Sequence, residues 1–206
     1  GNLLEDRASV FEMPAPLSNR FIHFSIKPDF ESFKQFSIKN NLHESIISFL
    51  AFRPSLLHKI DEARPAWPSP RSWFMANELH QKDMQIHSAI GEPAASEFYA
   101  YLDIYSNLPD LDAICAGSLK PTYPAEPSAR FAVNIGLGLR VKNEEKMRNA
   151  LLWIVNAAPA EWQSSFVMDM IQHAKEDGNI ATLAKIIRNE KTLSSKITQF
   201  RDLILQ

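Results

Sequence analysis

Two arginines lie in local sequences that could present them to an anion. Arg71 lies within WPSPRSW (67–73), directly after Ser69 and Pro70. Serine favours the position that caps a helix N-terminus, and proline fits the first helical position because its missing N–H costs nothing there. These residues predict a helix start with Arg71 in the first turn. A cation opposes the helix dipole at that end, so either Arg71 extends into solvent or a negative group sits beside it.

The second arginine, Arg20, closes the segment EMPAPLSNR at residues 12–20, just before a short apolar segment. For both arginines the alternative is a surface or interface position without a ligand, because charged side chains mostly face solvent. Local chemistry alone leaves both interpretations open.

Other polar clusters give weaker indications of a site. His80, Asp83 and His87 could share one helix face and bind a metal, but a fourth ligand is missing and solvated polar residues are the simpler interpretation. We therefore expect no metal site. Cys115 stands between two apolar residues and fits a small buried hydrophobe.

Signatures of common catalytic sites are missing from the sequence, which has no P-loop, no G-x-S-x-G motif, no H-E-x-x-H motif and no paired cysteines. The segment 136–138 (GLG) lacks the third glycine of a dinucleotide fingerprint, so we interpret it as a point of close helix packing. Tyr99, Tyr101 and Tyr105 could stack on a ring, yet aromatic residues at this spacing usually belong to a core.

The composition is that of an ordinary globular chain, with 45% hydrophobic and 22% charged residues among 206. A formal net charge of −2 argues against a nucleic-acid partner, because it leaves no broad basic surface. No apolar run approaches the ~20 residues that span a bilayer, and no signal peptide opens the chain, so we expect no membrane partner. The single cysteine fits a reducing compartment, and we expect a cytoplasmic location.

The spacing of apolar residues predicts one strand and many helices. Residues 21–26 (FIHFSI) alternate between two faces and form the only predicted strand. A lone strand is unstable because both its edges are unpaired, so we expect it to pair with something outside this chain or with another copy.

Helical spacing begins after this segment. A short helix is expected near 15–19, and four helices between about residues 29 and 108, the first capped by Asp29 and the third starting at Ser69. A proline-rich segment at 120–127 precedes further helical stripes, of which one ends at Gly178.

Several segments together resemble one family. EMPAPLSNRFIHF (12–24) is similar to the end of the nucleotide-binding core in MoxR-type AAA+ ATPases, where a Pro-Leu-x-x-Arg-Phe pattern precedes the last core strand. FLAFRPSLLHK (49–59), AWPSPRSW (66–73) and GEPAASEFYAYL (91–102) resemble the helical lid that follows. The resemblance covers about residues 2–112, in matching order and spacing, whereas the remainder matches only loosely.

The resemblance implies a role for each matching residue. Arg71 would be sensor 2, the lid arginine that contacts the γ-phosphate of its own subunit's ATP, with Ser69 and Pro70 starting its helix. Arg20 would be the arginine finger that reaches the neighbouring subunit's ATP, and Asn2 would be sensor 1, which positions the attacking water. Guanidinium groups suit such tasks because they hold phosphate oxygens in pairs and stay charged.

The resemblance also divides the chain. Residues 1–27 would be a remnant of the α/β core, 28–112 the helical lid domain and 113–206 a C-terminal helical extension. The expected fold is therefore mainly α, with an AAA+ lid-type bundle, a helical annex and one orphan β-strand. The family's phosphate-binding loop and Mg²⁺-binding acidic motif would lie upstream, so we expect ATP and Mg²⁺ in the intact parent, no cofactor in this fragment and no catalysis by it alone.

The implied partners are the parent's own upstream AAA+ core, the neighbouring subunits of a ring and an unknown protein substrate that the ATPase remodels. The alternative is a free-standing all-helical adaptor that binds another protein and has no nucleotide role. A phosphate-binding loop upstream of Asn2, or its absence, distinguishes the two.

Overall fold

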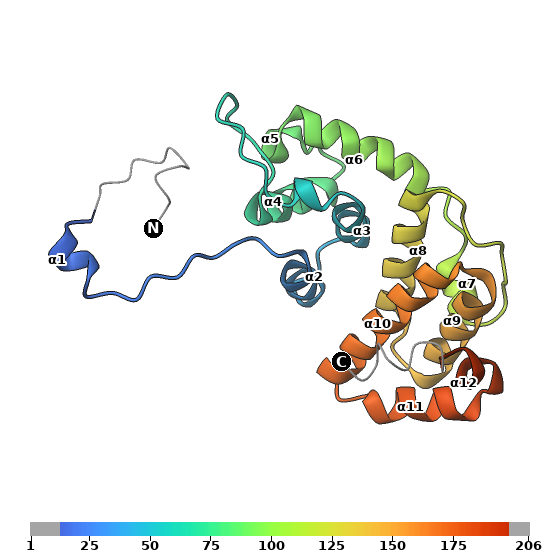
Figure 1. Ribbon diagram of the computed structural model, residues 1–206. Helices are drawn as coiled ribbons and strands as arrows, with labels where there is room; N and C mark the ends of the chain where they lie inside the picture. The colour runs from blue at the N-terminus through green and yellow to red at the C-terminus, as the bar shows by residue number, and fades with distance from the viewer. Residues whose placement is uncertain (1–12, 198–206) are drawn as a thin grey trace.

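A computed structural model describes residues 13–197 and shows a mainly helical protein, as expected from the sequence (Figure 1). The helices are α1 (Ala15–Ser18), α2 (Phe30–Lys39), α3 (Glu44–Phe52), the 3₁₀ helix η2 (Pro54–Leu56), α4 (Pro70–His80), α5 (His87–Ile90), α6 (Glu92–Tyr105), α7 (Leu111–Cys115), α8 (Pro127–Arg140), α9 (Glu144–Ala157), α10 (Ala160–Glu176), α11 (Ile180–Asn189) and α12 (Lys191–Ile197).

The strand predicted at 21–26 is absent, since the described residues contain no strand or sheet. This segment instead belongs to a long extension that leads from α1 to α2, outside the helical body (Figure 1). Residues 22–28 form no backbone–backbone hydrogen bond with any described residue. The alternating pattern is correct for a strand, but no described segment offers the edge with which it could pair.

Local signals fix several helix ends where the sequence predicts them. Asp29 caps α2, and its Oδ2 accepts a hydrogen bond from the backbone N–H of Ser32 at 2.8 Å. Gly178 follows α10 with φ of +70°, a conformation that glycine adopts without steric cost. The short helix near 15–19 is confirmed as α1.

The helical body contains two hydrophobic cores. The first lies among α2 to α6 and includes Ile46, Phe49, Trp73 and Phe98, none of which exposes more than 1% of its surface. The second lies among α7 and α9 to α12, around residues such as Leu151 and Phe166. The predicted boundary between residues 112 and 113 remains a prediction, and α7 spans it.

Helix α8 belongs to both cores. Its residues Ala132 and Ile135 are buried in the first core, whereas Val133 and Leu137 are buried in the second. The helix runs between the two groups of helices in Figure 1. This helix was not predicted from the sequence, although close helix packing was expected at the GLG segment and is found at Gly136.

Two small residues show how tightly this region packs. A Cβ added to Gly136 would lie 2.4 Å from Cδ1 of Leu111, so a larger residue here would force the Leu111 side chain to shift where α7 packs on α8. Cys115 is fully buried, as predicted, and burial raises the pKa of its thiol. In the described part of the chain, no helix is both long and apolar enough to cross a bilayer.

Candidate functional site

Helix α4 begins where the sequence predicts, with Ser69 as the N-cap and Pro70 in the first helical position. The Ser69 hydroxyl accepts a hydrogen bond from the backbone N–H of Ser72 at 3.1 Å, and the backbone N–H of Ser69 donates to the Ser72 hydroxyl at 2.7 Å. This reciprocal arrangement is a capping box with serine in place of the usual glutamate. It fixes the backbone on which Arg71 stands.

Hydrogen bonds from neighbouring residues fix the position of this helix start. Trp73 is fully buried and donates its indole N–H to the carbonyl oxygen of Leu56 at 2.8 Å. The loop before the cap is fixed by a hydrogen bond from the Lys59 N–H to the Pro68 carbonyl oxygen, 2.9 Å long. Because these contacts are buried or backbone-mediated, the first turn of α4 has a defined position in the molecule.

Gly91 adds a further constraint on the same loop. Its φ is +79°, and a Cβ at this position would lie only 2.6 Å from the carbonyl oxygen of Ala66. A side chain would therefore both strain the backbone and displace the loop that leads to Ser69. The glycine lets the start of α6 pack directly on this loop.

Arg71 itself is exposed at the rim of an open cavity of about 680 Å³. His58, Trp67, Met75 and Ser88 also line this cavity. Within residues 13–197, no hydrogen bond or ion pair involves the Arg71 guanidinium. The side chain thus carries an uncompensated positive charge beside a helix N-terminus, which is itself positive.

This arrangement has the chemistry of an anion-binding site. A guanidinium offers several N–H donors in one plane, and the start of an 11-residue helix adds attraction for negative charge. The aromatic ring of Trp67, packed edge-on against His58 at 5.7 Å between centroids, provides a flat apolar wall nearby. A phosphate or carboxylate would relieve the unfavourable placement of Arg71.

Arg20 lies elsewhere. It follows α1 directly and is exposed, and α1 lies well apart from α4 (Figure 1). Among the described residues no side-chain partner is found for Arg20. The structure therefore does not bring Arg20 and Arg71 together. Asn2 lies outside the described residues.

The shared helix face suggested for His80, Asp83 and His87 is wrong, because α4 ends at His80 and α5 begins at His87. Asp83 lies between them in the left-handed conformation, with φ of +54°, so it does not continue either helix. No cluster of histidine, cysteine, aspartate or glutamate suited to a metal is found in the described part of the chain.

His80 instead pairs with another imidazole. Its ring meets that of His43 edge-on at 5.1 Å between centroids, while Nδ1 of His43 caps α3 by accepting from the Ser45 N–H. Burial is the largest cause that lowers the pKa of His80, the neighbouring His43 adds to it, and Asp83 opposes it. The surroundings of His80 therefore disfavour its protonated form.

The tyrosine group is largely structural, as the core interpretation predicts. Tyr101 is 2% exposed, and the Tyr99 hydroxyl bonds to the backbone N–H of Ile86 and to the side chain of Gln85. Tyr105 donates its hydroxyl to the carboxylate of Glu44.

Glu44 is the centre of a network that the sequence analysis missed. Arg140 at the end of α8 holds Glu44 with two nitrogens, at 2.5 Å and 2.9 Å, and donates from Nε to Asp112 at 3.1 Å. Burial alone would raise the pKa of Glu44, but hydrogen bonds from Arg140 and Tyr105 outweigh it, so the pKa is lowered. The network ties α3 and α6 to α7 and α8.

A second missed contact involves a buried lysine. Lys34 of α2 has a side chain only 5% exposed, and its Nζ lies 2.9 Å from Oδ2 of Asp169 in α10. A signal for this exists in the sequence, because Lys34 follows Phe30 by four residues and so falls on the apolar face of its helix.

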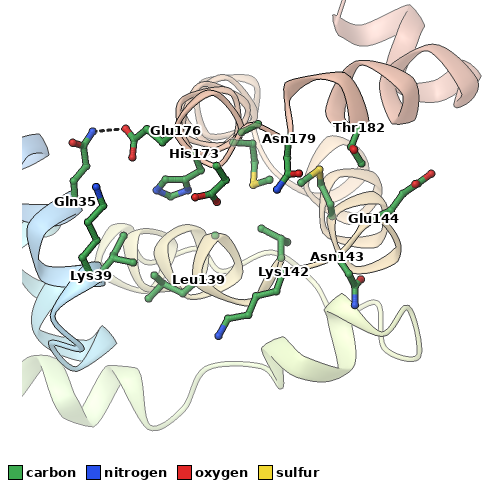
Figure 2. A pocket seen from close by; sticks show the side chains of 17 residues that line it. Gln35, Lys39, Leu139, Lys142, Asn143, Glu144, His173, Glu176, Asn179 and Thr182 are labelled. Atoms are coloured by element: carbon green, nitrogen blue, oxygen red, sulfur yellow. Dashed lines mark hydrogen bonds between the residues drawn. The ribbon is translucent and has the colours of Figure 1, made fainter.

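A cavity of about 440 Å³ lies along the same junction, between α2, the end of α8 and the helices α9 to α11 (Figure 2). Met147 and Met170 form part of its apolar wall. Gln35 bridges to Glu176 across one side at 2.7 Å, and Lys142 and Glu144 point away from His173 (Figure 2). Most of its polar groups are exposed, and Gln35 and Glu176 bond to each other.

Comparison with known proteins adds no relative, since no family model, curated protein or solved structure matches the chain.

Proposed function

We propose that this chain is the lid region of a MoxR-like AAA+ ATPase, in which ATP binding and hydrolysis remodel a partner protein. In this proposal Arg71 is the sensor-2 arginine and contacts the γ-phosphate, while Arg20 is an arginine finger for the neighbouring subunit. ATP and Mg²⁺ would bind to the parent's core, and the partners would be that core, neighbouring ring subunits and a protein substrate.

One observation carries the proposal: Arg71 is presented by a rigid, capped helix start and has no anionic partner among the described residues. The capping box and the buried Trp73 fix the position from which Arg71 would reach the phosphate. The unpaired backbone of residues 22–28 also fits, because a last core strand separated from its sheet would leave just such a segment.

The test uses the parent protein with its upstream residues. We expect Arg71→Ala to lower the rate of ATP turnover by at least about tenfold, because a charge that stabilises the transferred phosphoryl group is lost. Arg64→Ala is the matched control, since Arg64 is also an exposed arginine near this loop but pairs with Asp61. ATP turnover that is equal in Arg71→Ala and wild type would contradict the sensor-2 role.

A second measurement uses the present chain. Because the phosphate-binding loop is not part of this sequence, titration calorimetry with Mg²⁺ and ATP should show no saturable heat. Micromolar binding of ATP by the chain alone would contradict the proposal that the parent's core binds the nucleotide.

One observation favours the alternative function, an adaptor that binds another protein. The segment 21–26 exposes large apolar side chains, with Ile22 and Phe24 each 82% exposed and Ile26 93% exposed. Side chains of this kind are typical of binding segments. An adaptor would retain partner binding in Arg71→Ala and lose it when Ile22 and Phe24 are both changed to Ser.

A further inference from the structure

The first helices and the C-terminal helices are joined along two separate lines of contact. Along one line, α8 packs against α3 and contributes buried residues to both hydrophobic cores. Along the other, α2 lies against α10 through side-chain contacts. A hinge motion would require the two groups of helices to be connected by little more than a loop. Here they are in contact at two places, each formed by packed helices.

The contact between α2 and α10 contains a buried ion pair, and separating its two charges would cost free energy. Lys34 is nearly fully buried, and Asp169 is its closest carboxylate at 2.9 Å, with Glu31 at 3.7 Å. If α2 moved away from α10, the aspartate would lose this lysine. If instead the lysine stayed buried without it, an uncompensated charge would remain in a poorly solvated place.

The contact between α8 and α3 also contains a partly buried ion pair. Arg140 of α8 binds Glu44 of α3 in a bidentate manner, and both side chains are only about a quarter exposed, at 23% and 22%. Any rotation of α8 against α3 would break this pair together with the Tyr105 contact to the same carboxylate. The two ion pairs join different pairs of helices, α2 with α10 and α3 with α8, so separating the two groups of helices would break both.

We propose that α2 to α6 and α8 to α11 move as one rigid body, with α8 as the shared wall and the Lys34–Asp169 pair as the contact that fixes α2. The C-terminal helices then act as a brace for the first bundle. The consequence for the lid rests on the proposed function: any movement of the lid would carry the C-terminal helices with it. The brace itself is tested without nucleotide, so the two can fail separately.

The first experiment measures a distance between the two groups of helices. Spin labels attached through Asp103→Cys on α6 and Arg188→Cys on α11 occupy exposed positions, while the native Cys115 is fully buried and stays unlabelled. Pulsed electron spin resonance on the chain should give one narrow distance distribution. A broad distribution, or one with several peaks, would overturn the proposal.

The second experiment tests the pair. Asp169→Asn should broaden that distribution and speed amide exchange in α2 by about tenfold, because Lys34 loses its counter-charge. Asp177→Asn, a change to an exposed carboxylate next to the end of α10, is the control and should change neither quantity. If amide exchange in α2 is unchanged in Asp169→Asn, the Lys34–Asp169 pair does not fix α2, and this part of the proposal is wrong.

A third variant covers the case in which Asp169→Asn unfolds. Lys34→Met with Asp169→Leu removes both charges and replaces them with apolar groups of similar reach. We expect this double variant to keep the narrow distribution and slow exchange. A folded double variant with a broad distribution would contradict the shared-wall role of α8.

Discussion

The indole N–H of Trp73 donates to the carbonyl oxygen of Leu56, 2.8 Å away, and the ring has no exposed surface. Trp73→Phe should therefore lower the free energy of unfolding by about 2 kcal/mol or more, since it leaves a buried carbonyl unsatisfied and a space beside the smaller ring. Urea denaturation measures this difference.

Trp162 provides the matched control. Its indole nitrogen is buried and has no hydrogen-bond partner in the structure. Trp162→Phe makes the same exchange of rings without breaking such a bond, and Trp162 is only partly buried, so the change should cost at least about 1 kcal/mol less than Trp73→Phe. Equal losses for the two variants would show that the Trp73 hydrogen bond adds nothing to stability.

Arg71 should be dispensable for stability. Its guanidinium has no partner among residues 13–197 and lies at the positive end of α4, so Arg71→Gln should leave the free energy of unfolding unchanged or slightly increased. Urea denaturation at low ionic strength is the suitable measurement, because salt screens the dipole interaction. A loss above about 1 kcal/mol would mean that Arg71 serves the fold and would weaken its assignment to a ligand.

Arg140→Met should be strongly destabilising. It leaves the half-buried Glu44 without the cation that lowers its pKa, and we expect a loss of about 2–3 kcal/mol in the free energy of unfolding. Arg148→Met is the control, because the Arg148–Glu190 pair is more exposed and should contribute less than about 1 kcal/mol. Similar losses of unfolding free energy in the two variants would mean that the Glu44 network contributes no more to stability than an exposed ion pair.

His80 should make the stability depend on pH. Its folded pKa is lowered from the ordinary value of 6.5, so the unfolded chain binds a proton more readily than the folded one. The contribution of His80 is therefore complete above pH 6.5 and is lost as the pH falls from 6.5 through the lower folded pKa. His80→Gln should flatten the fall in unfolding free energy between about pH 7 and pH 5.

His87 lies exposed at the start of α5 and serves as the control for this experiment. The stability of His87→Gln should follow the wild-type pH profile. If His80→Gln retains the full wild-type slope, His80 is not the source of the pH dependence.

Local signals in the sequence predicted much of the helical framework. Ser69 and Asp29 cap the helices assigned to them, and Gly178 takes the left-handed conformation after α10. These predictions succeeded because capping depends on a few adjacent residues and on little else in the fold. Arg71 lies in the first turn of α4, as the sequence predicts, and its role in binding a ligand stays a prediction.

Features that depend on distant partners were missed or wrong. Residues 21–26 alternate as a strand does, but a strand also needs an edge, and none is found among the described residues. The contacts of Lys34 with Asp169 and of Glu44 with Arg140 join residues 135 and 96 positions apart, which no local pattern specifies. Helix α8 was overlooked because its glycines weaken the helical signal while they serve tight packing.

The two-sided burial of α8 has a practical consequence for dissecting the protein. A chain cut near residue 113 would leave the first core without Ala132 and Ile135, and would expose the apolar side of α3 on which α8 lies. Such a piece would offer a sticky surface to its own copies and should precipitate during expression. Separate production of the two halves is thus a poor route to studying either one.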